Sequence, residues 1–574
     1  MIAPAPKPRR LALVPKARGS CSARWQRAIA SLLLLWTLLL PSSVRAAAIA
    51  ATSENPLVTE AALDQMRAGG NAVDAAVTAA LVAGVVSPTS SGIGGGGFAM
   101  VRLQAEARTV LLDFRETAPR ELDASAFEAR PLPAAERGKY VGVPGEVAGL
   151  YLLHQRYGRL PWQACVRPAI RLAELGFKVG THLGRMLQAS RERLMVDAEL
   201  ARRYFPGGRP AREGQTIRNP TLAATLREIE KRGPPAFYTG PIAAEIVRTV
   251  QAHGGSLSLL DLATYQPVWR EPLRFEWEGY EVFTMPPPSA GGLMVAQTLG
   301  LFSSAYLQRL GLGSGAYHHM LAESLRGAIA DRMRYLGDPD HQPVALDQLL
   351  APARLARRRA SLALDRTHAL PRFGLDEHGT HHLVTSDADG NMVSLTTTIN
   401  RLFGAKLTTA HGIVLNDELN DFNSRKDVAA FGMSASPNRP RPGARPLSSM
   451  TPTIVVRDGR AVLGIGGSGG PAIPTNVTQV LVSRLAFGTA PEAAVRAPRI
   501  YIFSAPLLML LDAGIPAEQS DDLRWRGEIV DVMKFTGTAV QMIAVDPDGT
   551  LRAAADPRKF GSGRVLSLPA PAPR

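Results

Sequence analysis

The local pattern of this chain changes at Thr380, and that change constrains the fold more than any other feature of the sequence. From Pro161 to about Leu370 the patterning is mostly helical, interrupted by glycine and proline. After Thr380 come short segments rich in β-forming residues, separated by turn signals such as Asp389-Gly390. These segments are Leu383 to Ser386, Met392 to Thr398, Gly412 to Leu415, Thr453 to Arg457 and Ala461 to Ile465. Helices early and strands late, without regular alternation, predict an α+β fold with layers around stacked sheets.

The chain can bury a large core, because it has 574 residues of which 45% are hydrophobic and 20% charged. Its formal net charge is +15, but residues 1–46 contain no acidic residue and supply eight of these charges. They come from Lys7, Arg9, Arg10, Lys16, Arg18, Arg24, Arg27 and Arg45. No basic stripe with interleaved aromatic residues follows, so the sequence predicts no nucleic-acid partner and no membrane-surface role for the mature protein.

Residues 1–46 have the pattern of a secretory signal. A basic region precedes an apolar run from Ala28 to Leu40, which is too short to span a bilayer comfortably. Small side chains at Val44 and Ala46 fit cleavage after Ala46. We therefore expect an exported protein, periplasmic or secreted, with no stable membrane association after cleavage. An uncleaved membrane anchor is the alternative interpretation.

Cysteine usage limits the chemistry of the mature chain. Cys21 lies in the signal, which leaves Cys165 alone. An intramolecular disulfide and a Cys/His metal cluster are therefore excluded, and the fold must be stable by packing. We expect no metal and no organic cofactor.

The glycine-rich turn that follows Leu463 admits three interpretations. Gly464–Gly469 matches a dinucleotide fingerprint between a strand and a helix, but the acidic residue some twenty positions on, Glu492, lies at a helix start instead of a strand end. Gly466–Gly470 also matches a G-x-S-x-G nucleophile elbow, yet all eleven histidines precede Ser468, so a serine triad of that order is excluded.

The third interpretation is an anion-binding turn ahead of a helix N-terminus. Gly469 and Gly470 would then form an oxyanion hole, in which each backbone donor contributes about 10²- to 10³-fold in rate. A tight turn without a catalytic role is the alternative.

Gly379 and Thr380 open the strand-rich part of the chain and suggest a nucleophile made by chain cleavage. A threonine at a new N-terminus supplies a hydroxyl and, through its own amine, a base within hydrogen-bond reach. The sequence thus predicts Thr380 as the catalytic residue.

Several further motifs accompany Thr380 in one order along the chain. They are Gly69–Ala76, Ser90–Phe98, Asp113–Glu116, Val143–Gly145, Asn416–Phe422, Arg445–Thr453 and Ala555–Arg558. From about Ala51 to Gly561 the sequence resembles the γ-glutamyltranspeptidase family of N-terminal-nucleophile hydrolases. The resemblance implies a precursor that cuts itself into a large subunit, residues 47–379, and a small subunit, residues 380–574, which together form a four-layer αββα fold.

The resemblance also implies how cleavage and catalysis proceed. Thr380 Oγ would attack the carbonyl of Gly379, which offers no side chain to obstruct it, and water would hydrolyse the ester. The freed amine, with a reference pKa of roughly 7.7 to 8.0, could then accept the hydroxyl proton and return it to a leaving amine.

The site residues implied by the resemblance suit a γ-glutamyl group, which carries an α-carboxylate and an α-ammonium. Those implied for the carboxylate are Arg115, Ser448 and Ser449. Those implied for the ammonium are Asp421, Asn400 and Glu418. Thr398 would hydrogen-bond the nucleophile. Taken singly, each has an ordinary interpretation as a surface ion pair or a turn residue.

The chain departs from the family pattern in three places. His381 stands where a second threonine is usual, a different turn replaces the usual one at 467–472, and by loose alignment Phe431 replaces a lid tyrosine. His381 and His382 are neighbours on a strand and point to opposite faces, so we expect both to be structural.

The function expected from the resemblance is an exported, self-processing γ-glutamyl acyltransferase and hydrolase. It would transfer the γ-glutamyl group of glutathione or a related amide to water, an amino acid or a short peptide. The alternatives are a glutaryl-type acylase, which has no ammonium to bind, and a non-catalytic exported relative.

Overall fold

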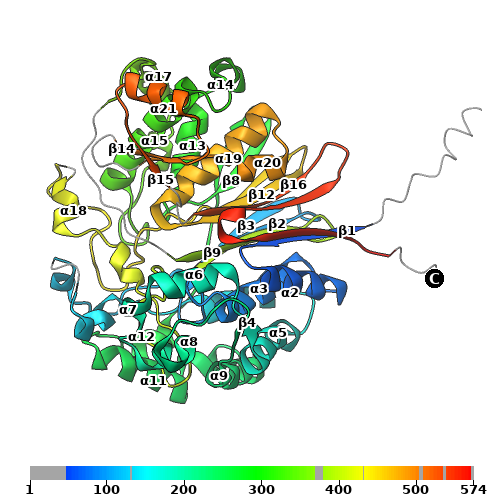
Figure 1. Ribbon diagram of the computed structural model, residues 1–574, viewed down its shortest axis with the longest axis vertical. Helices are drawn as coiled ribbons and strands as arrows, with labels where there is room; N and C mark the ends of the chain where they lie inside the picture. The colour runs from blue at the N-terminus through cyan, green and yellow to red at the C-terminus, as the bar shows by residue number, and fades with distance from the viewer. Residues whose placement is uncertain are drawn as a thin grey trace, which may run out of the picture. The chain divides into compact units, whose positions relative to one another are not determined.

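Two antiparallel sheets stacked face to face form the middle of the structure (Figure 1). The computed structural model describes residues 47–128, 132–368, 379–430, 432–502, 508–533 and 538–569, and all elements below belong to one unit, Ala48–Leu568. The predicted signal, residues 1–46, and the lid position Phe431 lie outside the described residues.

The first sheet has seven strands and contains the start of the predicted small subunit at its centre. In spatial order the strands are β18 (Ser562–Ser567), β1 (Ala48–Ser53), β9 (Thr380–Ser386), β10 (Met392–Thr398), β2 (Gly96–Leu103), β3 (Arg108–Asp113) and β6 (Val268–Arg270). Strand β9 pairs with β1 on one side and with β10 on the other. Thr380 therefore begins an interior strand; it pairs with Thr398 on β10, and the pairing with β1 starts at Leu383.

The second sheet has six strands. In spatial order they are β17 (Leu551–Ala555), β16 (Ala539–Val545), β12 (Arg460–Ser468), β11 (Thr453–Arg457), β8 (Tyr280–Thr284) and β7 (Leu273–Trp277). Strand β12 packs against β9 and β10. His382 on β9 faces Gly466 on β12, where an added Cβ would lie 2.2 Å from the imidazole Cε1. A glycine at this point lets the two sheets close over the ring.

Helices cover the outer faces of both sheets, which gives the four-layer αββα order (Figure 1). On the first sheet lie α2 (Pro56–Arg67) and α3 (Ala72–Val86), backed by α4 (Glu146–Tyr157), α5 (Trp162–Leu175) and α9 (Pro220–Arg232). On the second lie α13 (Gly291–Leu301), α19 (Ile473–Phe487) and α20 (Pro491–Arg496), with α15 (Gly315–Tyr335) packed against α13. The predicted fold class is confirmed.

The remaining elements lie at the periphery of these layers. The helices are α6 (Thr181–Ala189), α7 (Arg191–Leu194), α8 (Ala198–Tyr204), α10 (Pro235–Tyr238), α11 (Gly240–Ala252), α12 (Leu259–Thr264), α14 (Ser304–Leu310), α16 (Leu346–Leu349), α17 (Pro352–Ser361), α18 (Arg425–Ala430) and α21 (Ala517–Trp525). The strands are β4 (Phe177–Lys178), β5 (Thr216–Ile217), β13 (Ile500–Ile502), β14 (Leu508–Asp512) and β15 (Ile529–Met533).

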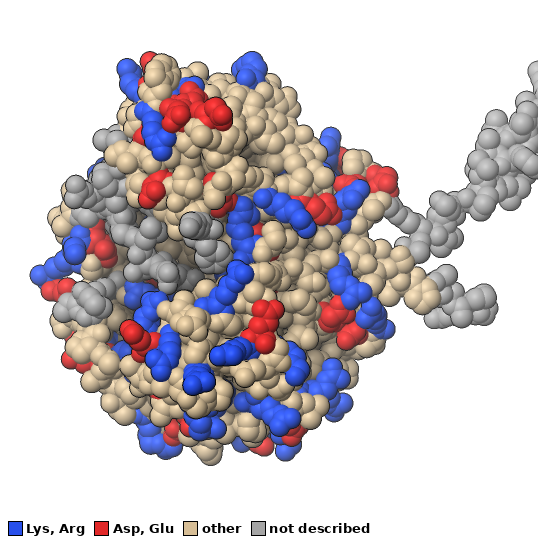
Figure 2. Space-filling view, in the orientation of Figure 1, with Lys and Arg blue, Asp and Glu red and all other residues tan. Residues whose placement is uncertain are grey.

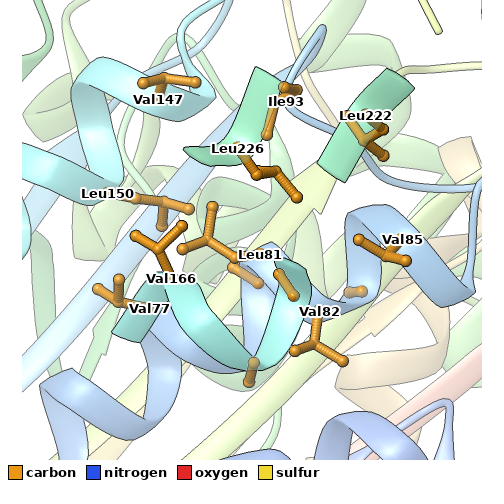
Figure 3. Close-up of a cluster of buried hydrophobic side chains, with 14 of the residues drawn as sticks. Val77, Leu81, Val82, Val85, Ile93, Val147, Leu150, Val166, Leu222 and Leu226 are labelled. Atoms are coloured by element: carbon orange, nitrogen blue, oxygen red, sulfur yellow. The ribbon is translucent and has the colours of Figure 1, made fainter. Parts of the chain in front are cut away.

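Helix α3 forms the centre of the first helical layer. An Asn71–Asp74 capping box starts it, and nearly every one of its side chains is buried. Figure 3 shows Val77, Leu81 and Val82 converging with apolar side chains of α4, α5 and α9. The alanine-rich composition allows this close approach on all sides, because small side chains let neighbouring backbones pack tightly.

One expectation from the sequence is wrong in detail. Gly412 to Leu415 forms no strand; it contributes only an isolated bridge between Thr408 and Val414, within a loop. The helical middle also contains strands, among them the hairpin β7–β8, whose two-residue turn is Glu278-Gly279. Both turn residues have positive φ, and the flanking residues alternate in character, so the hairpin signal was present in the sequence.

Among the described residues, no helix is long and apolar enough to cross a membrane. On the face shown in Figure 2, basic and acidic side chains are interspersed over most of the surface.

Candidate active site

Thr380 lies where β9 begins, directly opposite Thr398 at the end of β10. Their side-chain oxygens are 3.4 Å apart. The Thr398 hydroxyl donates to the carbonyl oxygen of Gly379 at 2.7 Å and accepts from the backbone N–H of Asn400 at 2.8 Å. Because the single Thr398 proton goes to Gly379, Thr380 is the donor between the two threonines. The predicted contact between Thr398 and Thr380 is thus present.

Gly379, on the other side of the predicted cleavage point, has no room for a side chain. A Cβ added there would lie 2.3 Å from the carbonyl oxygen of Thr89. The residue before Thr380 is therefore held in a tight, buried place, with its carbonyl next to the threonine pair.

A pocket opens over Thr380, and every predicted site residue except Gly469 lines it. Its lining residues are Arg115, Arg332, Thr380, Thr398, Asn400, Glu418, Asp421, Ser448, Ser449, Met450, Gly470, Pro471 and Ile473. Arg115 and Arg332 precede position 380 in the sequence, and the other lining residues lie at this position or after it. Several of them lie in segments that connect strands of the two sheets.

Arg115 is held by three acceptors. Its guanidinium contacts the carboxylates of Glu418 and, at 2.7 Å, Asp421, while Nε donates to the carbonyl of Pro446 at 2.8 Å. Burial opposes the charge of Arg115, but the carboxylates raise its pKa above the ordinary value. Burial also raises the pKa of Glu418 well above its usual range, with Arg115 acting against this. The side chains of Arg115 and Glu418 are each 1% exposed, against 20% for Asp421.

The two serines lie beside a second arginine. Arg332, on α15, donates through Nη1 to Ser449 Oγ at 2.6 Å and to the Ser448 carbonyl at 3.3 Å. The Ser448 hydroxyl accepts from the backbone of Met450 at 3.0 Å. Sequence reasoning missed Arg332, because one arginine in a long helix carries no motif of its own.

The glycine turn connects β12 to α19 with two residues of positive φ. Gly469 has φ +115° and Gly470 has φ +59°. Gly470 lines the pocket with Thr380, whereas a Cβ added at Gly469 would lie 2.4 Å from a methyl carbon of Thr538. Both positions therefore require glycine, for conformation and, at Gly469, also for space.

A buried ion pair lies behind Thr380. The Lys559 ammonium donates to Ser468 Oγ at 2.6 Å, is 3.4 Å from the Thr380 carbonyl oxygen, and pairs with Glu54 at 3.3 Å. Burial raises the pKa of Glu54, and Lys559 acts against this. Glu54 also accepts from the backbone N–H of His382. The pair links the N-terminal and C-terminal parts of the fold to β9, and sequence reasoning missed both residues.

Neither histidine next to Thr380 lines the pocket. His382 Nδ1 is 2.8 Å from Thr396 Oγ1, and the ring nitrogens of His381 have no hydrogen-bond partner among the described residues. Burial lowers the pKa of each to about 3, so both rings are neutral at physiological pH. These surroundings agree with a structural role.

Two more buried carboxylates are Glu116, which follows Arg115 in the chain, and Glu146. Glu146, at the start of α4, accepts from Thr397 Oγ1 at 2.8 Å, and neither oxygen of Glu116 has a hydrogen-bond partner among the described residues. Burial raises the pKa of each to about 8, and the charge of Glu146 raises that of Glu116 further.

Comparisons with known proteins identify similar sequences and structures. The sequence model of gamma-glutamyltranspeptidase matches residues 58–566. The chain is 38% identical over 528 residues to glutathione hydrolase 2 of Arabidopsis thaliana, covering 86% of this chain and 90% of that protein. It is 37% identical over 517 residues to the glutathione hydrolase proenzyme of Pseudomonas aeruginosa, covering 87% and 91%. The structure resembles that of cephalosporin acylase from Bacillus halodurans, with a TM-score of 0.81 and 29% identity over 92% of this chain and 96% of that one.

Proposed function

Because the chain belongs to the γ-glutamyltranspeptidase family, we propose that it cleaves the γ-glutamyl amide of glutathione and related compounds. The γ-glutamyl group passes to water or to an amino acid or short peptide. The observation that carries this proposal is the position of Thr380 in one pocket with the arginines and the Asp421 carboxylate. A nucleophile beside groups of both charges suits a substrate that is itself zwitterionic.

The ammonium of the substrate is assigned to Asp421. Of the two carboxylates on Arg115, Asp421 is 20% exposed and Glu418 is 1% exposed, so a ligand reaches Asp421. Asn400 lines the same pocket with its side chain fixed to the carbonyl of Asp417 at 3.1 Å. Glu418 then serves mainly to hold Arg115.

Maturation is proposed to start at Gly379. The hydrogen bond from Thr398 polarises the Gly379 carbonyl, and Thr380 Oγ adds to its carbon. The C–N bond to Thr380 breaks as its nitrogen takes up the hydroxyl proton, which leaves an ester. Water hydrolyses the ester and gives a free carboxylate at Gly379 and a free amine at Thr380.

Turnover then uses the freed amine as the base. The amine of Thr380 accepts the proton of its own Oγ, which attacks the γ-carbonyl of the substrate. Backbone N–H groups of Gly469 and Gly470 are proposed to stabilise the oxyanion. The proton passes to the leaving amine, and the γ-glutamyl ester on Thr380 is transferred to water or to an acceptor amine. This chemistry uses no metal and no organic cofactor.

We also propose export and a two-subunit mature enzyme. Residues 1–46 carry the signal pattern, and cleavage before Thr380 would give subunits of residues 47–379 and 380–574. Strand β9 of the second pairs with β1 of the first, so the subunits would stay together after cleavage.

One assay tests the proposal. Purified enzyme should release para-nitroaniline from a γ-glutamyl anilide, and Thr380→Ala should not. Electrophoresis under denaturing conditions should show two fragments, the smaller beginning at Thr380, and a single chain for the variant. Activity from an uncut chain would contradict the mechanism.

A glutaryl acylase is the second candidate, because the structure resembles a cephalosporin acylase. A glutaryl group has no ammonium, so the accessible Asp421 would have nothing to bind. Release from a glutaryl anilide with none from the γ-glutamyl anilide would favour the acylase.

A further inference from the structure

A second cavity lies beside α19 and shares no lining residue with the pocket over Thr380. Its volume is about 250 Å³. The walls come from the start of α15 with the loop before it, the middle of α19, α20 with the segment after it, and the segment between β14 and α21. Most of the wall is apolar, with Leu312, Tyr317, Val480, Ala494, Pro498 and Ile515. Leu312 and Pro498 are exposed, so the cavity opens to solvent.

Three other lining residues contain buried polar atoms that have no hydrogen-bond partner among the described residues. These atoms are His318 Nδ1, Ser483 Oγ and Arg499 Nε, in residues that are at most 4% exposed. The other ring nitrogen of His318, Nε2, has no partner in the described part of the chain either, but it is not fully enclosed. A polar group that has lost water without gaining a partner raises the free energy, and a hydrogen bond to a ligand lowers it again. His318 Nε2 is therefore an open hydrogen-bonding position in a mostly apolar cavity.

The described lining of this cavity carries no uncompensated charge. Arg499 is its one residue with a formal charge, and it pairs with Asp556 at 2.6 Å and donates to the Val495 carbonyl at 2.9 Å. Burial lowers the pKa of His318 to about 4, so its ring is neutral at physiological pH. An ion that entered the cavity would lose water without gaining a counterion. The lining therefore favours a neutral ligand.

The neutral ring of His318 indicates the polar group of the ligand. A neutral imidazole has one N–H donor and one acceptor nitrogen, so Nε2 donates in one tautomer and accepts in the other. A hydroxyl both donates and accepts, and it can bond to Nε2 in either tautomer. A single hydroxyl is therefore the polar group that suits this position.

The volume of the cavity indicates the size of the ligand. A cavity of about 150 Å³ holds benzene, and pockets for drug-sized ligands begin at about 300 Å³. At about 250 Å³, this cavity has room for one or two rings. An aromatic body would also gain ring contacts with Tyr317 and His318 in the wall.

We propose that this cavity is a second binding site of the protein and takes a small neutral aromatic alcohol, with its rings against the apolar wall and its hydroxyl on His318 Nε2. The site shares no residue with the pocket over Thr380, so its test does not depend on the function proposed for that pocket.

Three probes with the same two-ring body test the proposal. They are 2-naphthol, naphthalene and 2-naphthoate, which carry a hydroxyl, no polar group and a negative charge, respectively. Binding to the purified protein is measured by equilibrium dialysis at about pH 7. We expect 2-naphthol to bind at one site with a Kd on the order of 0.1 mM. Naphthalene should bind about 3- to 10-fold more weakly, and 2-naphthoate at least about tenfold more weakly.

Two variants locate the site. His318→Phe keeps a ring but removes Nε2, so it should weaken the binding of 2-naphthol about 3- to 10-fold and leave that of naphthalene unchanged. Ser483→Leu places a larger side chain in the lining and should abolish the binding of both. If the melting temperature shows that Ser483→Leu does not fold, Ala497→Leu, at a half-buried position of the same lining, takes its place. The control is His253→Phe at the C-cap of α11, outside the cavity, and it should match wild type.

Three results would overturn the proposal. They are the absence of saturable binding of 2-naphthol to wild type, equal affinities for the three probes, and retention of 2-naphthol binding by the cavity-filling variant. An unchanged affinity of His318→Phe for 2-naphthol would refute the assignment of the hydroxyl to Nε2.

Discussion

Replacing Glu146 by glutamine should stabilise this protein at alkaline pH. Glu146 is 1% exposed and its hydrogen-bond partner is the hydroxyl of Thr397, a donor that a glutamine carbonyl can equally accept. Burial raises its pKa from 4.5 to about 8. Glu146→Gln therefore keeps the shape and the hydrogen bond while it removes the charge.

The direction of the change in stability with pH follows from proton binding. Since the pKa of Glu146 is higher in the folded chain than in the unfolded one, the folded chain binds more protons between about pH 4.5 and 8, and stability falls as pH rises through this window. At about 1.4 kcal/mol for each pKa unit, the full shift corresponds to roughly 5 kcal/mol. The neighbouring Glu116 titrates in the same range, so we expect the variant to gain about 2 to 4 kcal/mol over wild type between pH 5 and 9.

The measurement is urea unfolding between pH 5 and 9, with Thr380→Ala in both proteins so that each remains one chain. The difference in the free energy of unfolding between Glu146→Gln and its parent should widen as pH rises. Glu492→Gln is the matched control, a first-turn helix glutamate that is exposed, and it should show no such trend. A constant or narrowing difference would refute the claim that Glu146 is protonated because it is buried.

Three further predictions concern the nucleophile. Thr398→Val removes the donor to the Gly379 carbonyl and leaves the Asn400 N–H without its acceptor. The rate of chain cleavage, followed over time by gel electrophoresis, should therefore fall about 10- to 100-fold, whereas Thr398→Ser should keep most of the wild-type rate. Gly379→Ala places a Cβ 2.3 Å from the Thr89 carbonyl oxygen and should slow the same cleavage; maturation at the wild-type rate would argue against a crowded scissile position. Lys559→Met leaves Glu54 as an uncompensated buried carboxylate, so the free energy of unfolding should fall by about 3 to 5 kcal/mol and the melting temperature should fall with it. The loss should be smaller at low pH, where Glu54 is protonated. An unchanged melting temperature would mean that the ion pair is not formed.

The fold class could be predicted because its signals are local. Periodicity before Thr380, short β-rich segments after it and turn dipeptides between them each depend on a few neighbouring residues. The β7–β8 hairpin had a local signal, but at 412–415 and at β6 tertiary pairing decided the structure. Residues 412–415 have the composition of a strand, yet they pair with no sheet and lie in a loop. Strand β6 has only three residues, and its pairing with β3 is what makes it a strand.

The candidate site was predictable to the extent that motifs mark it. Thr380, Thr398 and Gly470 lie together in one pocket with the predicted charged and hydroxyl residues. Arg332, Lys559 and Glu54 could not be found in the same way. Each is a single charged residue outside any motif, and its role depends on its neighbours in the folded structure. Their partners are more than a hundred positions away along the chain.

By itself the sequence determined the chemistry that is available here. It specifies a threonine after a glycine, glycines where a turn needs positive φ, and arginines, carboxylates and hydroxyls in sufficient number for a zwitterionic ligand. Only the tertiary structure decided which charges compensate one another. It encloses Arg115 between two carboxylates and leaves Arg332 beside two serines, because the strength and the availability of a charge depend on its burial and on its neighbours in space.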